Sequence, residues 1–140
     1  MYSDEVSTGA LPAALAAVRQ VVVDYEALEL AIVFGSHVSD SVRPDSDLDV
    51  AVSFGRPLTG QEQIQITEDL ALATGRAIDL IDLTSAGEPL LGQIVTNGRR
   101  IAGTPAAFAR VLTRHLVDEA DFLPIRDRIL KERRDAWIAE

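Results

Sequence analysis

Cysteine is absent from this 140-residue chain. Its absence excludes disulfides, thiol catalysis and thiolate metal sites. The sequence also has no apolar run near the ~20 residues that a membrane-spanning helix needs. Its first residues include Asp4 and Glu5 instead of a basic segment followed by an apolar one, so they predict no signal peptide. We therefore expect a cytoplasmic protein with no membrane partner.

Basic residues are scarce: the chain has 13 Lys and Arg against 22 Asp and Glu, for a net charge of −9. Proteins that hold a long nucleic acid draw much of their affinity from Lys and Arg on phosphates, so this balance counts against direct nucleic-acid binding. It disfavours a polymerase, or a transferase that modifies tRNA by itself. A small nucleotide accompanied by a cation, or a basic protein partner, suits such a chain better.

Helical and extended patterns alternate along the sequence. Hydrophobic residues make up 47% of it, enough for one domain over residues 1–140, with a core at about 8–103 and a C-terminal helical region at about 104–140. The expected helices lie at about 8–25, 59–75, 85–98 and from 104 onward, and the expected strands at about 28–35, 48–54, 77–83 and 99–102. This succession predicts an α/β (α+β) fold in which helices pack on a small mixed β-sheet.

Local signals predict where several helices begin and end. Two Ser/Thr-x-x-Glu capping boxes, opened by Thr59 and Ser85, each predict a helix start. Thr104, followed by a proline, predicts the start of the last helix. Pro124 lies well inside that helix and is expected to break or kink it, because proline lacks the backbone donor and clashes with the preceding turn.

Asp47 and Asp49 are the strongest functional signal. They follow the dipeptide Gly35–Ser36 with ten residues in between, and that dipeptide ends an apolar stretch typical of a strand. In the strand that begins at about residue 48, residues two apart point the same way, so the two carboxylates share one face. Carboxylates held side by side repel each other unless a positive charge lies between them. Hard divalent cations such as Mg²⁺ prefer oxygen ligands of this kind.

A third carboxylate comes from the strand expected at about 77–83. Asp79 and Asp82 fall on opposite faces of that strand, so only one of them can point toward Asp47 and Asp49. Asp79 lies nearer the strand start, and we take it as the third metal ligand. Asp82 is interpreted as a turn residue or as a partner for a nearby helix N-terminus.

Each motif also has an ordinary structural explanation. Gly35–Ser36 taken alone is more often a helix cap after a strand, and paired Asp residues can occupy an exposed strand face. Asp is depleted in strands, however, so two in one strand and a third on a neighbour need a cause. Glycine lets the backbone approach a phosphate closely, and serine adds a hydroxyl and an amide donor. Together the motifs favour a metal and phosphate site.

These residues resemble the motif of the DNA polymerase β-type nucleotidyltransferase superfamily: Gly35–Ser36, ten residues, Asp47–Leu48–Asp49, and Asp79 on a later strand. The small size and the run from Ser46 to Asp49 resemble its minimal branch, the MNT nucleotidyltransferases. Proteins of that branch are prokaryotic antitoxins paired with HEPN-domain ribonuclease toxins. The resemblance covers roughly residues 28–103.

The resemblance implies an Mg²⁺-dependent enzyme that transfers AMP from ATP to a tyrosine hydroxyl of a HEPN toxin and so neutralises the toxin. Asp47, Asp49 and Asp79 would be the catalytic and metal-binding residues, with two Mg²⁺ ions between them. The residues expected at the nucleotide phosphates are Gly35, Ser36, Arg43 and Ser46. Relatives often carry Arg–Gly shortly after the Gly–Ser turn, where this chain has Ser39–Asp40. That departure concerns the phosphate contacts and leaves the carboxylates intact.

Two other functions remain open. The chain could modify a small molecule such as an antibiotic, but enzymes of that kind usually need extra structure around the acceptor, and only about 40 residues follow the core. It could also be an antitoxin that masks its toxin without catalysis, but a cluster of acids with no metal would then cost stability for no purpose. The basic run from Arg126 to Arg134 is either a solvated helix face or a docking surface for the toxin.

Overall fold

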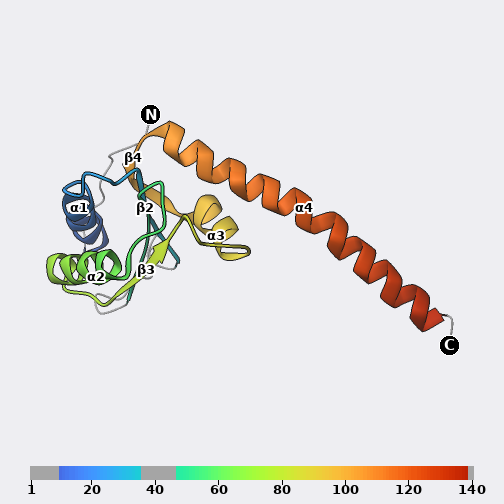
Figure 1. Cartoon of the computed structure of the whole chain (residues 1–140). Helices are drawn as coiled ribbons and strands as arrows, with labels where there is room; N and C mark the ends of the chain where they lie inside the picture. Colours follow the sequence, from blue (N-terminus) through green and yellow to red (C-terminus); the bar gives the residue numbers. More distant parts are fainter. Residues whose placement is uncertain (1–9, 36–46, 139–140) are drawn as a thin grey trace.

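The computed structural model describes residues 10–35 and 47–138, and these form alternating helices and strands (Figure 1). In chain order they are α1 (Ala10–Val22), β1 (Leu30–Phe34), β2 (Leu48–Ser53), α2 (Gly60–Thr74), β3 (Ile78–Asp82), α3 (Leu90–Asn97), β4 (Arg99–Gly103) and α4 (Pro105–Ile138). Every expected helix and strand is present, in the expected order. Their ends differ from the predicted ones by a few residues, most of all at the start of α3.

Four strands form one mixed sheet in the order β3-β2-β1-β4. β1 is antiparallel to both of its neighbours, whereas β2 and β3 are parallel. The two central strands are the most apolar, and all their side chains are buried except Asp49, which is half-buried. The mixed sheet and the edge position of β4 confirm the fold predicted from the sequence.

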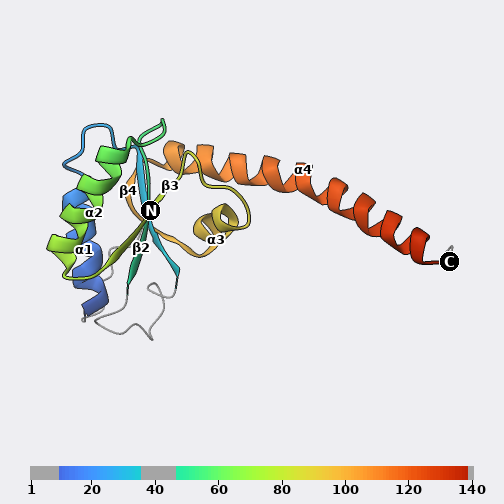
Figure 2. The ribbon, with the colours of Figure 1, turned by 60° about the horizontal axis from the view of Figure 1, so that its bottom comes forward.

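Helices cover both faces of the sheet (Figure 2). α1 and α2 pack on one face, and α3 with the first turns of α4 packs on the other. The sheet divides the core into two clusters: Val50 packs with Val18 and Leu70 on the first face, while Ala51 packs with Ile94 on the second. Each large aliphatic side chain buried in this way contributes roughly 1.5–3 kcal/mol. Neighbouring residues of β2 therefore serve different clusters, as the two-residue period of a strand requires.

The helix start predicted at Thr59 is confirmed. The Thr59 hydroxyl accepts a hydrogen bond from the backbone N–H of Glu62 at 3.1 Å, and the Glu62 carboxylate accepts one from the backbone N–H of Thr59 at 2.8 Å. The two terminal nitrogens of the Arg56 guanidinium, Nη1 and Nη2, donate to the Glu62 carboxylate, each at 2.8 Å. These bonds from Arg56, followed by the one from Thr59, lower the pKa of Glu62 to about 2. At the other end of α2, Gly75 adopts the left-handed conformation that commonly ends a helix.

The helix start predicted at Ser85 is wrong. α3 begins only after Pro89, which occupies the cap position without any capping side chain. Glu88, expected to complete a capping box, instead places its carboxylate 2.5 Å from Nδ1 of His115 in α4. His115 is buried, so this contact joins the segment before α3 to α4 at the edge of the core. A local pattern of four residues does not reveal a partner that is distant in the chain.

α4 extends far beyond its contacts with the body. Its predicted start is confirmed, because the backbone N–H of Ala107 donates to the Thr104 hydroxyl at 3.1 Å. Ala107 and His115 are buried against the body, whereas every described side chain from residue 116 outward is exposed. The helix accordingly projects away from the sheet (Figures 1 and 2). In the part of the chain that the structure describes, no helix is both long and apolar enough to cross a membrane.

The break predicted at Pro124 does not occur, because α4 runs from Pro105 to Ile138 as one helix. A proline inside a helix removes one backbone hydrogen bond and costs about 3 kcal/mol. The residues on both sides are mostly Ala, Leu, Arg, Glu and Lys, which favour helix. Their combined propensity offsets the single defect, so the helix does not end at Pro124.

Candidate active site

Three strands bring predicted site residues to one end of the sheet. Phe34, the last residue of β1, pairs with Asp49 of β2, and Asp49 pairs with Asp79 of β3. Because β2 and β3 are parallel, their first residues lie side by side. Because β1 is antiparallel to β2, its last residue meets them there. The sheet thus gathers Gly35, Asp49 and Asp79 from distant positions in the sequence.

Asp49 and Asp79 lie on the same face of the sheet. Leu48 and Val50 pack in the cluster beside α1 and α2, so Asp49 between them points to the opposite face. Asp79 is two residues from Ile81, which packs in the cluster beside α3 and α4. Asp49 is half-buried and Asp79 is exposed. A carboxylate pair therefore lines the face of α3 and α4 at the open end of the sheet.

Asp47 lies just before β2 and is exposed. Next to it, the backbone N–H of Leu48 donates to the carbonyl oxygen of Ala77 at 2.8 Å, so the chain at Asp47 runs beside the entry to β3. Within residues 10–35 and 47–138, no three His, Asp or Glu side chains come close enough together to form a metal-binding group. The structure joins Asp49 and Asp79 as a pair, with Asp47 on the exposed edge beside them.

Gly35 lies directly against Asp49. Its φ of +80° is in the left-handed region that favours glycine. A Cβ added to Gly35 would lie 2.5 Å from Oδ2 of Asp49, which is too close for any real side chain. Glycine thus leaves room for the Asp49 carboxylate at the end of β1. This end of the sheet carries the carboxylate oxygens of Asp49 and Asp79, which are of the kind that fits a hard divalent cation.

Asp82 is a structural residue, as its position on the opposite face of β3 predicted. Its carboxylate accepts hydrogen bonds from the backbone N–H of Leu58 at 2.9 Å and of Thr84 at 3.0 Å. The first bond fixes the segment that leads into α2, and the second closes the turn after β3. Asp82 therefore ties two loops together and takes no part in the acidic pair.

Several predicted contacts fall where the structure gives no description. The candidate phosphate-binding residues Ser36, Arg43 and Ser46 lie outside the described residues, as does the Ser39–Asp40 departure.

Two arginines, Arg99 and Arg100, belong to the same end of the sheet. Arg99 pairs in register with Val33 and Arg100 with Ile32, so β4 begins where β1 ends. Both side chains are half-buried and both make contacts within the described structure. From the sequence, Arg99 and Arg100 are either nucleotide contacts or a solvated strand edge, and the edge is the favoured interpretation. The strand order β3-β2-β1-β4 is what brings them near Gly35.

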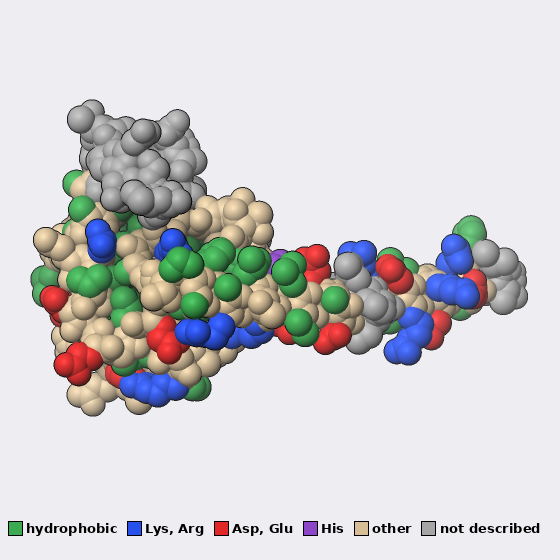
Figure 3. Space-filling model, turned by 90° about the horizontal axis from the view of Figure 1, so that it is seen from above, with side chains coloured by type: hydrophobic (Ala, Val, Ile, Leu, Met, Phe, Trp, Pro, Cys, Tyr) green, Lys and Arg blue, Asp and Glu red, His purple; other side chains and the backbone are tan. Residues whose placement is uncertain are grey.

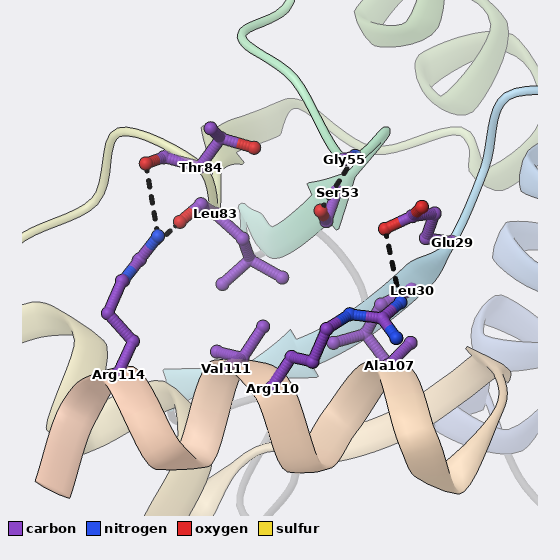
Figure 4. Close-up of a pocket in the computed structure, with 10 residues that line it drawn as sticks. All are labelled: Glu29, Leu30, Ser53, Gly55, Leu83, Thr84, Ala107, Arg110, Val111 and Arg114. Atoms are coloured by element: carbon purple, nitrogen blue, oxygen red, sulfur yellow. Dashed lines mark hydrogen bonds and ion pairs between the residues drawn. The ribbon is translucent and has the colours of Figure 1, made fainter.

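A separate cavity of about 180 Å³ lies at the opposite end of the strands, between the sheet and the start of α4 (Figure 4). Arg114 lines one side of it and donates hydrogen bonds to the carbonyl oxygens of Leu83, Thr84 and Ala86. Arg110 reaches Glu29 at 3.4 Å in an exposed ion pair of little energetic weight. These contacts anchor α4 to the loop after β3 and to the segment just before β1. The cavity is therefore a feature of that junction and not of the acidic end.

Comparison with known proteins places the fold and the acidic end in context. Residues 17–105 match the model of the family described as polymerase beta, nucleotidyltransferase. Because the match includes all four strands and the acidic pair, the chain belongs to the nucleotidyltransferases of this family. The match also contains Gly35 and the Asp47–Asp49 segment.

Individual proteins are also similar to this chain. The chain is 35% identical over 77 residues to the protein adenylyltransferase MntA of Shewanella oneidensis, and the aligned part spans 55% of each protein. It is similar to one chain of a toxin–antitoxin crystal structure with AMP-PNP, with 25% identity and a TM-score of 0.73 over 86% of this chain and 98% of that one.

A further similar structure shares the fold. It is a complex of a tri-AMPylated Shewanella oneidensis HEPN toxin with an MNT antitoxin, matched at 24% identity and a TM-score of 0.63 over 86% of this chain and 98% of the other.

Proposed function

We propose that this chain transfers AMP from ATP to a tyrosine hydroxyl of a HEPN-domain ribonuclease, and acts in this way as the antitoxin of that protein. The observation that carries the proposal is the register pairing of Asp49 with Asp79 beside Gly35. Membership of the nucleotidyltransferase family supports the reaction class. The names of the relatives support AMP as the transferred group and a HEPN protein as the acceptor. The cytoplasm is the compartment that this role requires.

The three carboxylates would hold the metal. Asp49 and Asp79, which are paired in register, would supply oxygen donors together with Asp47, and we assign two Mg²⁺ ions to them. In the described structure the three side chains are not yet close enough to form one metal-binding group. When bound, the ions supply positive charge for the triphosphate and lower the pKa of the acceptor hydroxyl. Without a cation, the carboxylates of Asp49 and Asp79 repel each other and any approaching phosphate.

The turn after β1 would hold the nucleotide phosphates. Gly35 carries no side chain, which lets backbone approach a phosphate closely; the space where its Cβ would stand is taken by the Asp49 carboxylate. Ser36 and Ser46 would add hydroxyl and amide donors, and Arg43 would add a positive charge at the triphosphate. These residues orient the α-phosphate toward the exposed side of the acidic pair.

The reaction exchanges one phosphate ester for another. The acceptor hydroxyl oxygen bonds to the α-phosphorus, the bond from that phosphorus to the bridging oxygen of the β-phosphate breaks, and pyrophosphate leaves. Asp79, exposed on the outer side of the pair, accepts the hydroxyl proton. Correct placement of such a proton acceptor contributes typically 10²–10⁴-fold to the rate.

The acceptor should arrive on another protein. Asp79 is exposed, and the described structure has no lobe beyond the sheet end that would enclose a small molecule. An open site of this kind accepts a side chain presented by a partner surface. This reasoning favours a protein acceptor over an antibiotic.

Intact mass spectrometry tests the proposal. The purified chain is incubated with ATP, Mg²⁺ and the HEPN-domain protein expected from the neighbouring gene, and both proteins are weighed. We expect the HEPN protein to gain one or more AMP groups, and Asp49→Asn to abolish the gain. Asp24→Asn, an exposed acid before β1, is the matched control and should leave the gain unchanged. Tight binding without a mass gain would replace our proposal with simple masking.

A further inference from the structure

The outer part of α4 carries an uncovered apolar stripe. Leu116, Leu130 and Trp137 have side chains that are 54%, 55% and 77% exposed. Leu130 follows Leu116 by fourteen residues and Trp137 follows Leu130 by seven, so all three fall on one side of the helix. A spacing in multiples of seven is the pattern by which helices pair lengthwise. We name this side of α4 the apolar stripe.

Nothing in the described structure covers the apolar stripe. From residue 116 outward the helix leaves the body, and its sides are open in every view (Figures 1 and 3). A stretch of 22 residues is about 33 Å long at 1.5 Å per residue. Helices draw most of their stability in water from packing, so a segment that packs on nothing is only marginally stable. Three large apolar side chains exposed on one side of such a segment, with charged residues between them, suit packing against another helix.

Charge along the same segment is divided by sign. From residue 116 to 121 it holds three acidic and no basic residues, whereas from 126 to 137 it holds five basic and three acidic residues. Figure 3 shows acidic side chains along the helix close to the body and basic side chains gathered toward its far end. The helix therefore has a negative inner half and a positive outer half.

We propose that the apolar stripe is covered by the same segment of a second copy of this chain, in antiparallel orientation. An antiparallel pair places the negative inner half of each helix against the positive outer half of the other. A parallel pair would place acid against acid. Two copies related by a two-fold axis contribute the same surface to the contact. The acidic inner half of each helix therefore meets the basic outer half of the other, once at each end of the pair.

The register follows from the stripe itself. When Leu116 of one copy lies opposite Trp137 of the other, the two-fold axis passes between residues 126 and 127. Arg126 then faces Asp127 of the second copy, and this pair occurs twice. In the same register Glu119 faces Arg134 of the second copy, again twice. The bodies lie at opposite ends of the paired helices.

Within a single copy these charged groups are weakly held. Arg126 lies 3.7 Å from Asp127, and Arg134 lies 3.9 Å from its neighbour Asp135, with all four side chains more than half exposed. Ion pairs of this kind contribute little to stability. The charges are therefore available to pair with a second copy.

Charge reversal tests both the occupant and the register. The full chain and three variants are compared by sedimentation velocity over a range of concentrations. Glu119→Arg and Arg134→Glu each create two like-charge contacts in the proposed pair, so each should weaken dimerisation by at least tenfold. Mixing the two variants in equal amounts should restore a dimer of wild-type strength, because every contact is then between opposite charges. Asp118→Arg makes the same charge change on a side turned away from the stripe, and should dimerise like the wild type.

Thermal melting of each variant confirms that the fold is intact, since Glu119 also lies 3.4 Å from Nε2 of His115. A wild-type chain that stays monomeric at all concentrations would overturn the proposal. So would a mixture of the two variants that fails to dimerise, or a control that behaves like Glu119→Arg. If Leu130→Asp leaves self-association unchanged and abolishes binding to the HEPN protein, the occupant of the stripe is that protein and our assignment is wrong.

Discussion

Gly35 and Asp49 touch across the β1–β2 pair, so closely that a Cβ on Gly35 would lie 2.5 Å from Oδ2 of Asp49. The glycine is therefore part of the carboxylate's environment and not only a turn residue. This relationship links the Gly–Ser motif to the acidic motif by direct contact, in addition to their spacing in the sequence. Gly35 thus has two roles. Its backbone adopts the left-handed conformation, and its missing Cβ leaves space for the Asp49 carboxylate.

Two glycine substitutions separate these roles. Gly35→Ala and Gly75→Ala both force alanine into the left-handed region, at φ +80° and +69°, so each should lose about 1–2 kcal/mol of stability. A Cβ on Gly75 would meet nothing within 4 Å. Only Gly35→Ala should therefore displace Asp49 and reduce AMP transfer, by roughly 100-fold for a misplacement on the scale of an ångström. Chemical denaturation and initial rates measure the two effects, and equal rates for both variants would contradict the role of the contact.

The two acids of β3 should respond in opposite ways to amidation. Asp79→Asn removes an exposed carboxylate from the site, so it should lower the transfer rate by 10²-fold or more with little change in stability. Asp82→Asn weakens two hydrogen bonds to backbone N–H groups, so it should lose about 1–3 kcal/mol of stability. The rate per folded Asp82→Asn molecule should stay near that of the wild type. The assignment of Asp79 fails if the two variants show the reverse pattern in rate and denaturation measurements.

Mg²⁺ should stabilise the protein when nucleotide is present. Binding to the folded state alone raises its stability by about 2.7 kcal/mol at 100 times the dissociation constant. In metal-free buffer, Asp79→Asn should melt no lower than the wild type, since it removes repulsion between Asp79 and its register partner Asp49. Differential scanning calorimetry measures both effects. A wild-type melting temperature that does not respond to Mg²⁺ with AMP-PNP would count against the metal assignment.

Acid should destabilise the start of α2 through Glu62. Its pKa is about 2 in the folded chain against an ordinary value of 4.5, because Arg56 and the Thr59 backbone hydrogen-bond to the ionised form. A lowered pKa means that the stabilisation is fully present above pH 4.5 and disappears as the pH falls toward 2. Glu62→Gln should therefore melt below the wild type at neutral pH, and the two curves should converge in acid. Parallel melting curves across that range would show that the Arg56–Glu62 pair has no such role.

Much of the fold follows from period and composition. The alternation in β2 placed Asp49 and Val50 on different faces of the sheet. The odd spacing between Asp79 and Asp82 likewise placed these two acids on different faces of β3, because a strand has only two faces. The capping box at Thr59 could also be predicted, since both of its hydrogen bonds lie within four residues. These features depend on local geometry alone.

Other features depend on contacts that no local pattern contains. Glu88 has the spacing of a capping residue, but its carboxylate pairs with His115 of α4, and the two are far apart in the sequence. Arg99 lies near the acidic end only because β4 pairs with β1 and not with β3. Strand order and tertiary ion pairs are properties of the assembled sheet. The sequence therefore predicted the acidic face well and its neighbours poorly.

Transfer of label from ATP tests the central claim most directly. The chain, Mg²⁺ and the HEPN protein are incubated with ATP labelled either at the α-phosphate or at the γ-phosphate, and the proteins are separated and counted. We predict that the HEPN protein acquires label from the α-phosphate and none from the γ-phosphate. When Asp49→Asn replaces the wild-type chain, the HEPN protein should acquire neither label. Label from the γ-phosphate, or a stable complex that acquires no label at all, would contradict the assignment of nucleotidyl transfer to the acidic pair.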